Sequence, residues 1–298
     1  MEIVMEHDLL IYNPKSGRTG LKDDFLGRIV QELTENGTMV TVYQTQNKGD
    51  AKEYIKRKQI RFDKIICCGG DGTLHEVVNG IMEIEERNIL AYIPSGSTND
   101  CARNIGITKE NAVYFIKRKE ITIIDLGIFN GEYFNYIAAF GAFTNIPFIT
   151  SQKIKNILGY FAYLLEGVKH LSDIKGKYIK VLLDDKIWIE DNIVLGMITN
   201  SFSVAGIKNR TRNITKLDDG KLEYLFVKMP ENLIELQLLI TSLLSEKLDE
   251  KYIYFGQVEK MHLESEEMEW TLDGENGGIH KQVEIQAVQK VLNMIVGE

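Results

Sequence analysis

The chain has 298 residues, of which 44% are hydrophobic and 26% are charged, and its formal net charge is −8. This composition is ordinary for a soluble globular protein, and the length corresponds to about two domains. No apolar stretch is long enough to cross a bilayer and no leader is recognisable, so we expect a cytoplasmic protein rather than a membrane-spanning or exported one. The acidic balance argues against nucleic acid as a partner.

The first 125 residues alternate between short apolar strands and amphipathic helices. Strands are expected at residues 9–12, 38–43, 65–68 and 89–93, and a helix follows each of them. Such alternation predicts an α/β domain with a mainly parallel sheet, helices on both faces, and ligands at the carboxyl ends of the strands. The glycines at 17, 69–72 and 96 each follow one of these strands, so we expect their loops to open onto one crevice.

The stretch from Lys64 to Ile84 carries the strongest local signal. Thr73 followed three residues later by Glu76 has the capping-box pattern, which predicts that a helix begins at Thr73 and points its free N–H groups into the glycine loop. Such a helix end attracts anions. A carboxylate in the same loop, Asp71, would repel a phosphate unless a divalent cation lay between them. The loop therefore predicts a Mg²⁺-nucleotide phosphate site; a simple tight turn is the alternative for this motif taken alone.

From about residue 121 the pattern changes to antiparallel β-structure. Asn130-Gly131 is typical of a type I′ hairpin turn, and Asp184-Asp185 marks a second hairpin. Further strands are expected at 193–199, 221–228, 252–256 and 268–272, helices at 154–171 and 231–244, and last strands at 283–288 and 291–296. We expect one domain at 1–125, rejoined by 284–298, and a second at 126–283.

Two acidic turns and a basic run in the second half could carry chemistry. The turn Asp273-Gly274-Glu275 could supply the carboxylate that takes a proton from an alcohol during phosphoryl transfer, or its acids could simply be solvated. The turn from Leu217 to Gly220 could be an ordinary β-turn. The basic residues Lys208, Arg210, Arg212 and Lys216 favour either a solvated loop or contact with anionic lipid headgroups.

Five motifs, taken together and in order, resemble the bacterial diacylglycerol kinase-type lipid kinases over nearly the whole chain. They are Asn13–Gly17, Gly69–Thr73, Pro94–Asp100, Leu217–Gly220 and Asp273–Glu275. The resemblance implies an NAD kinase-like, Rossmann-like α/β nucleotide domain followed by an antiparallel β-sandwich domain that binds the substrate, with ATP between them. It also implies ATP and Mg²⁺ as the nucleotide and metal.

The resemblance also implies roles for particular residues. Glu275 matches the general base, with Asp273 in support, and Asp71 matches the essential aspartate of the glycine loop. Asp219, with backbone carbonyls of Lys216 and Lys221, matches the ligands of a structural Mg²⁺. The nucleotide-binding positions are Asn13, Pro14, Lys15, Ser16, Gly17, Thr45, Gly69, Gly70, Asp71, Gly72, Thr73, Leu74, His75 and Ser97, and the charged network beside the metal consists of Arg18, Asp125, Lys169 and Asp219.

The function expected from the sequence is an ATP-dependent lipid kinase that phosphorylates a lipid hydroxyl, that of diacylglycerol in particular, to give phosphatidic acid. Its partners would be a lipid substrate in a membrane or micelle, met by peripheral contact at the inner face of the membrane. Edge strands of the second domain could pair copies of the chain into a homodimer. NAD kinase is one alternative, and a non-enzymatic protein that binds a nucleotide or a lipid for regulation is the other.

Overall fold

The computed structural model describes residues 6–17, 23–35, 37–57, 61–85, 88–97, 99–118, 120–141, 176–200, 217–244 and 248–297. The chain divides into two compact units, one formed by Met1–Ile124 with Lys290–Glu298 and the other by Asp125–Gln289. The sequence places these boundaries after residues 125 and 283. Within the described residues, no helix combines the length and the apolar character needed to span a lipid bilayer.

The first unit is a parallel sheet covered by helices on both faces. Its elements are β1 (His7–Tyr12), α1 (Asp23–Thr34), β2 (Met39–Gln44), α2 (Asp50–Lys56), β3 (Lys64–Gly69), α3 (Asp71–Met82), β4 (Ile89–Pro94), α4 (Asp100–Asn104), α5 (Ala112–Arg118) and the end of β13 (Glu275–Ile295). The strand order is β13-β4-β3-β1-β2, and every pair in it is parallel. β3 is buried along its whole length, as expected for a strand covered on both faces.

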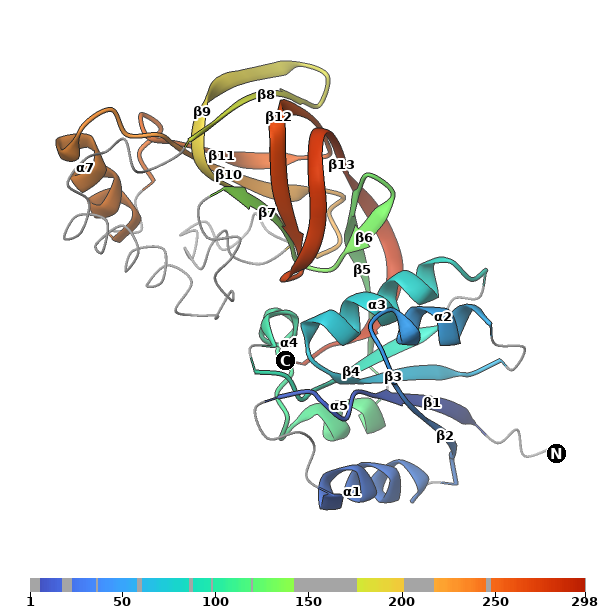
Figure 1. Cartoon of the computed structure of the whole chain (residues 1–298). Helices are drawn as coiled ribbons and strands as arrows, with labels where there is room; N and C mark the ends of the chain where they lie inside the picture. The colour runs from blue at the N-terminus through green and yellow to red at the C-terminus, as the bar shows by residue number, and fades with distance from the viewer. Residues whose placement is uncertain are drawn as a thin grey trace. The chain divides into compact units, whose positions relative to one another are not determined.

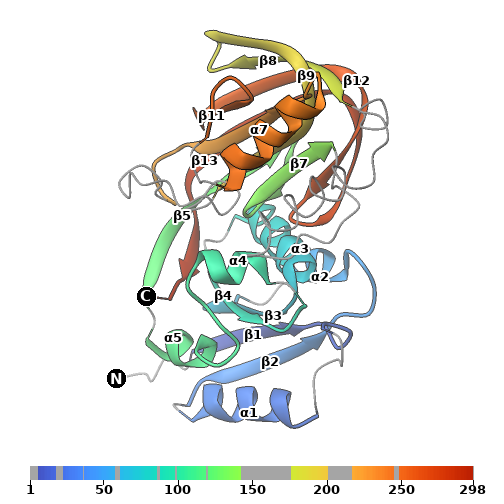
Figure 2. The ribbon, with the colours of Figure 1, turned by 90° about the vertical axis from the view of Figure 1, so that its left-hand side faces the viewer.

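The helices that follow β1 and β3 lie on opposite faces of the sheet. Helices α2 and α3 lie on one face, whereas α1 and α5 lie on the other (Figure 1, Figure 2). The chain therefore leaves the adjacent strands β1 and β3 toward opposite faces. In open α/β sheets, ligands bind outside the carboxyl ends of two strands that diverge in this way.

The second unit is built from antiparallel strands. Its elements are β5 (Ile121–Phe129) from Asp125 onward, β6 (Glu132–Phe134), β7 (Ile137–Gly141), β8 (Lys177–Leu183), β9 (Ile187–Thr199), β10 (Leu222–Lys228), α7 (Leu233–Leu244), β11 (Ile253–Val258), β12 (Lys260–Leu272) and the first part of β13. Strands β9 and β12 each pair with β7 over one half and with β8 over the other, so these strands close into a ring. The interior contains Phe140, Phe226 and Trp270.

The turns of this unit follow the predicted chemistry. Asn130 and Gly131 have φ values of 46° and 92° and join β5 to β6, which confirms the predicted type I′ turn. Asp184 and Asp185 also have positive φ, at 48° and 54°, where the chain turns from β8 to β9. The antiparallel character is confirmed, whereas the closure of the ring through β8 was not predicted from the sequence.

Several element boundaries differ from those expected. β12 begins at Lys260 rather than at residue 268, and the two last strands are one continuous strand, β13. Helix α5 was not predicted, although Thr108 and Asn111 mark its start by exchanging hydrogen bonds between the side chain of each and the backbone N–H of the other. The helix expected at 154–171 lies outside the described residues.

A buried ion pair joins β1 to β3 within the first unit. Lys64 Nζ lies 2.9 Å from Asp8 Oδ2, and the two side chains are only 8% and 1% exposed. Burial raises the pKa of the Asp8 carboxyl, although Lys64 opposes this shift. Folding therefore favours the protonated form of Asp8. The free-energy cost of burying its carboxylate is absent at pH values below the pKa of an unfolded aspartate, and it is complete above the raised pKa of the folded state.

We predict that Lys64→Met destabilises the fold by about 3 kcal/mol at neutral pH, because it leaves the Asp8 carboxylate buried without a partner. Since the carboxyl can then take up a proton, the loss should be smaller at about pH 5 than at about pH 8. Urea unfolding at both pH values measures this difference. The double variant Asp8→Asn/Lys64→Met, which carries no buried charge, should recover most of the stability; equal losses at both pH values would contradict the assignment.

Candidate functional site

The loops after β1, β3 and β4 meet at the carboxyl edge of the parallel sheet. A Cβ atom on Gly96 would lie 2.6 Å from the Cα atom of Gly70, and one on Gly17 would lie 2.6 Å from the carbonyl oxygen of Ser95. Gly17 also has a φ of +81°, which L side chains rarely adopt. The backbones are too close for any other residue at these positions. The three glycine loops therefore lie against one another, as their expected opening onto one crevice requires; the crevice itself stays a prediction.

Asn13 joins the loop after β1 to the loop after β3. Its backbone N–H donates to the carbonyl oxygen of Cys68 at 3.0 Å, and its side-chain amide donates to Thr73 Oγ1 at 3.1 Å. Its side-chain oxygen accepts the N–H of Lys15 at 2.9 Å, which turns the chain after β1. In this turn Pro14 is half-buried, Ser16 is buried and Lys15 is exposed. Lys15 is thus the side chain of the loop that is open to an anion.

The loop after β4 is shaped by two residues that the sequence did not single out. The Asn99 side chain accepts the N–H of Gly96 and donates to the Gly96 carbonyl oxygen, both at 2.8 Å. The hydroxyl of Tyr92 donates to the carbonyl oxygen of Gly69 at 3.2 Å. Burial raises the pKa of Tyr92 well above its usual value, so this hydroxyl remains a neutral donor. The predicted contact Ser97 is exposed in the same loop.

Asp71 does not lie in the glycine loop, which corrects the expectation from the sequence. Helix α3 begins at Asp71 rather than at Thr73, because Gly70 is its N-cap residue in an extended conformation. The Asp71 side chain is buried, and its oxygens accept the N–H groups of Asp100 at 3.0 Å and Cys101 at 3.2 Å. Its carboxylate therefore holds the start of α4 and, with it, the loop after β4.

Glu76 does not form the predicted capping box. Its Oε1 atom accepts the N–H of Gly49 at 2.7 Å, and its Oε2 atom accepts the N–H of Ala51 at 3.2 Å. Gly49 is the N-cap residue of α2 and has no side chain with which to cap that helix. The carboxylate of α3 takes over this task because α2 and α3 lie side by side (Figure 1).

The remaining predicted nucleotide positions differ in their surroundings. Thr45 follows β2, and its backbone N–H donates to the carbonyl oxygen of Tyr12 at 3.0 Å, so the loop after β2 lies beside the end of β1. Gly72 is half-buried in the first turn of α3, followed by the buried Thr73. Leu74 and His75 are also buried, and Asn79 Nδ2 donates to the His75 carbonyl oxygen at 3.0 Å. The side chains of Leu74 and His75 thus belong to the packing of α3.

In the second unit, Asp273 and Gly274 form the turn between β12 and β13. Their φ values are 51° and 86°, and Leu272 pairs with Glu275 across the turn, as in a type I′ hairpin. Asp273 is only 2% exposed. The alternative that its acid is merely solvated is therefore wrong for Asp273, whereas Glu275 is half-buried as the first residue of β13.

The Asp273 carboxylate holds the segment that connects β6 to β7. Oδ2 accepts the backbone N–H of Asn135 at 2.8 Å and its side-chain amide at 3.0 Å. Oδ1 accepts the N–H groups of Tyr136 at 3.0 Å and Ile137 at 3.2 Å. Bonds of this kind to an ionised acceptor are stronger than those between neutral groups. They fix the turn that carries Glu275.

The second acidic turn is tied to β5 and β11. The N–H of Gly220 donates to Asp125 Oδ2 at 2.6 Å, and the N–H of Asp125 donates to the Leu217 carbonyl oxygen at 2.6 Å. Asp219 accepts the N–H of Lys221 at 3.1 Å and the side-chain amide of Gln257 at 3.4 Å. Partly exposed carboxylate and carbonyl oxygens fit a hard cation such as Mg²⁺.

The described residues include only part of the predicted metal region. Arg18, Lys169 and Lys216 lie outside the described residues. Across the described ranges, no three His, Cys, Asp or Glu side chains gather closely enough to hold a metal ion. A site made of one carboxylate and backbone carbonyls would not need such a group.

Comparison with known proteins identifies the family. Residues 7–128 match the diacylglycerol kinase catalytic domain. A diacylglycerol kinase of Bacillus subtilis (strain 168) is 33% identical over 284 residues, which cover 92% of this chain and 91% of that protein. The chain belongs to the diacylglycerol kinase family. This membership supports a lipid kinase, a phosphotransferase whose acceptor is an alcohol group.

Solved structures place this diacylglycerol kinase family member on a known fold. A diacylglycerol kinase from Bacillus anthracis str. Sterne superposes with a TM-score of 0.74 at 28% identity, covering 99% of this chain and 98% of that chain. An NAD kinase from Archaeoglobus fulgidus, solved in complex with ATP, superposes with a TM-score of 0.54 at 11% identity, covering 98% and 94%. The fold is therefore shared with NAD kinases, although that likeness shows the fold alone.

We predict that Gly96→Ala in this kinase family member forces the loops after β3 and β4 apart, because its Cβ atom would meet the Gly70 backbone at 2.6 Å. Amide protons of residues 70–74 and 99–102 should exchange faster by about tenfold or more, as expected when a local structure opens more readily. Hydrogen exchange measures this. Gly27→Ala is the matched control, since a Cβ atom there meets nothing within 4 Å. Unchanged exchange in Gly96→Ala would contradict the close approach.

Proposed function

We propose that this protein transfers the γ-phosphoryl group of ATP to the hydroxyl group of diacylglycerol and so produces phosphatidic acid. The observation that carries the proposal is the meeting of three glycine loops at the carboxyl ends of β1, β3 and β4, where the chain leaves β1 and β3 toward opposite faces of the sheet. Glycine loops followed by a helix start offer backbone N–H groups to phosphate oxygens. The family membership supports the lipid acceptor.

The nucleotide would be held largely by backbone. The start of α3 after Gly70 would offer backbone N–H groups to the phosphates, and the exposed Lys15 in the loop after β1 would add a positive charge. Thr45 and Ser97 would bound this region from the loops after β2 and β4. Because side-chain bonds already fix these loops, little ordering is left for the nucleotide to impose.

Mg²⁺ would neutralise charge on the phosphates when it is bound. Asp71 is the residue that we assign to its organisation. Its carboxylate lies at the start of α3, directly after the glycine turn, and holds the loop after β4 through the N–H groups of Asp100 and Cys101. We propose Asp219, with backbone oxygens of Lys216 and Lys221, as ligands of a second, structural Mg²⁺, on the grounds of their oxygen chemistry.

Glu275 would accept the proton of the lipid hydroxyl, and Asp273 would hold Glu275 in place through its bonds to the segment 135–137. Asp273 is then a positioning residue. Its side chain is buried and accepts four hydrogen bonds, which supports a role in shaping the turn rather than in the proton transfer itself.

We predict that Glu275→Gln lowers kcat by a factor of about 100 to 10,000, the usual contribution of general base catalysis, while ATP affinity changes less than about twofold. Transfer of labelled γ-phosphate measures turnover, and calorimetric titration measures binding. Glu284→Gln is the matched control, because Glu284 lies on the same strand, is exposed and pairs with Lys260 at the surface. Near-normal turnover of Glu275→Gln would show that another group is the base.

The acceptor should be identified with a panel that contains diacylglycerol and other lipids in mixed micelles, together with NAD. Label in phosphatidic acid supports the proposal. Label in NADP would instead favour the NAD kinase alternative, with which the shared fold is consistent. Binding of ATP without transfer to any acceptor would favour a non-enzymatic regulatory protein.

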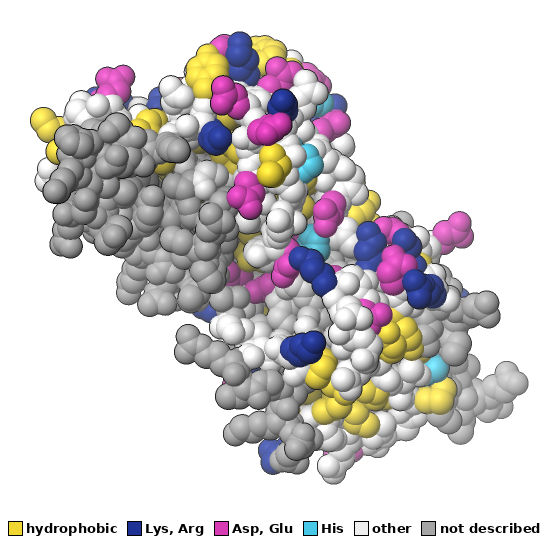
Figure 3. Space-filling view, viewed as in Figure 1, with side chains coloured by type: hydrophobic (Ala, Val, Ile, Leu, Met, Phe, Trp, Pro, Cys, Tyr) yellow, Lys and Arg dark blue, Asp and Glu magenta, His cyan; other side chains and the backbone are white. Residues whose placement is uncertain are grey.

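We propose that the enzyme meets its lipid by peripheral contact at the inner face of the membrane, through the basic residues Lys208, Arg210 and Arg212. These residues lie outside the described part of the chain. On the face shown in Figure 3, acidic and basic side chains are interspersed, so the coloured residues of that face offer anionic lipid no large positive patch.

We predict that replacing Lys208, Arg210 and Arg212 with glutamate reduces sedimentation with vesicles that contain anionic phospholipid. Each basic residue near such a surface contributes about 1 kcal/mol, so a loss of tenfold or more in binding is expected for the triple variant. Vesicles of zwitterionic lipid alone are the control. Unchanged binding to anionic vesicles would exclude this run as the contact surface.

A further inference from the structure

We propose that Glu76 is a positioning residue of the nucleotide site: from helix α3 it fixes the loop of residues 45–49, so that this loop and the start of α3 after Gly70 act as one preformed surface. The inference rests on the nucleotide site proposed above. It adds to that site a residue whose side chain is engaged with backbone groups rather than with the ligand.

The contacts of Glu76 span two helices. Its carboxylate accepts the N–H of Gly49 at 2.7 Å and of Ala51 at 3.2 Å, one on each oxygen. Gly49 ends the 45–49 loop and has a φ of +83°. Glu76 itself lies less than two turns into α3, which starts directly after Gly70. One side chain thus links the end of one loop to the helix that begins at the other.

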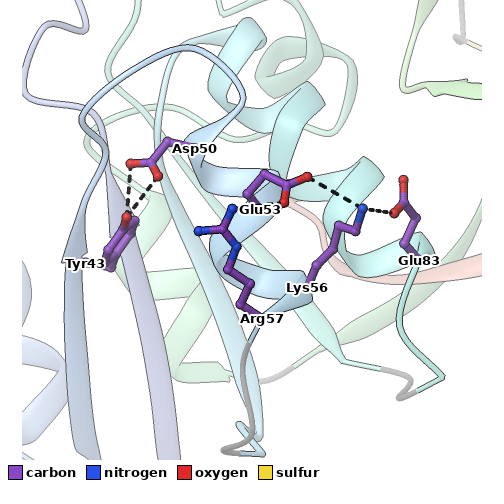
Figure 4. A network of polar contacts seen from close by, with 6 residues as sticks. All are labelled: Tyr43, Asp50, Glu53, Lys56, Arg57 and Glu83. Carbon is purple, nitrogen blue, oxygen red and sulfur yellow. Dashed lines mark hydrogen bonds and ion pairs between the residues drawn. The ribbon is translucent and has the colours of Figure 1, made fainter.

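The beginning of the 45–49 loop is fixed independently. The N–H of Thr45 donates to the carbonyl oxygen of Tyr12 at 3.0 Å, and the N–H of Gln46 donates to Asp50 Oδ2 at 2.8 Å. Asp50 also accepts the hydroxyl of Tyr43 at 3.0 Å, as Figure 4 shows. These bonds tie the loop to β1, β2 and the first turn of α2. Glu76 adds the tie to α3, and therefore to the loop after β3.

The packing of α2 against α3 has other supports, so the effect of Glu76 on the loop can be separated from an effect on the fold. At the far end of the helix pair, Glu83 lies 2.6 Å from Lys52 and 2.7 Å from Lys56; the Lys56 contact is drawn in Figure 4. A Cβ atom on Gly80 would lie 3.1 Å from Ile55, which shows how closely the helices approach. Losing Glu76 should free Gly49 and its loop without separating the helices.

The substitution Glu76→Gln tests this directly. A glutamine has the same size, but its single side-chain oxygen can accept only one of the two N–H groups, and its amide nitrogen is left facing the other donor. Since a bond between a backbone donor and a charged acceptor is among the stronger hydrogen bonds, we expect ATP to bind about tenfold more weakly. The value of kcat should change less than about twofold, because the reacting groups remain in place.

The experiment compares the full-length protein with Glu76→Gln, Glu76→Asp and Glu83→Gln. Binding of ATP with Mg²⁺ is measured by calorimetry, stability by thermal unfolding, and KM and kcat with the acceptor found above. Glu83→Gln removes charge from the same helix pair away from the loop, so it should leave ATP affinity within about twofold of the parent. Glu76→Asp keeps the charge but is one methylene shorter, and an intermediate loss is expected. It also provides a second test if the glutamine variant folds poorly.

Each outcome supports or overturns the inference. A specific loss of ATP affinity in the two Glu76 variants supports it. Equal affinity in all four proteins, or an equal loss in the Glu76 and Glu83 variants, would show that Glu76 has a structural role only. A parent protein that binds no ATP would overturn the proposed function and this inference together, whereas ATP binding without transfer to any lipid would overturn the proposed function alone.

Discussion

Hydrogen bonds from backbone N–H groups to carboxylates distant in sequence hold the candidate-site loops of both units. In the first unit Asp71 fixes the start of α4, and Glu76 fixes the start of α2. In the second, Asp273 gathers the backbone of 135–137, and Asp125 holds Gly220. Such charge-assisted bonds satisfy donors that loops and helix starts would otherwise leave open. The loops are ordered because acidic side chains from elsewhere complete them.

This constraint explains where prediction from the sequence succeeded and failed. The order of strands and helices in the first unit, the meeting of the glycine loops and the turn at Asn130-Gly131 were predicted because apolar periodicity and turn chemistry are local properties. The roles of Asp71, Glu76 and Asp273 could not be predicted, because each carboxylate accepts hydrogen bonds from backbone N–H groups that lie between 25 and 138 residues away in the sequence. From the neighbouring sequence alone, Glu76 is assigned to a capping box, Asp71 to a cation site beside a phosphate, and Asp273 to a turn that could be solvated. Only the fold reveals its partner.

Kinases with different acceptors share this fold, so the fold alone does not determine which acceptor this chain phosphorylates. The glycine loops belong to a region that can be shared with NAD kinases, since the whole fold is similar at 11% identity. The turn that carries Glu275 belongs to the second unit, with its closed ring of strands. The acceptor has to be argued from the residues of the site, because function lies in the site rather than in the fold.

The path of β13 has a consequence for how the protein is made. Residues 293 and 294 supply the strand that pairs with β4, whereas the rest of the first unit lies before residue 125. During synthesis the ribosome must add more than 160 residues, at about 5–20 per second, before that strand exists. For roughly ten seconds or longer β4 therefore lacks this partner strand. A truncation before residue 289 would remove that strand and leave the edge of β4 without this partner permanently.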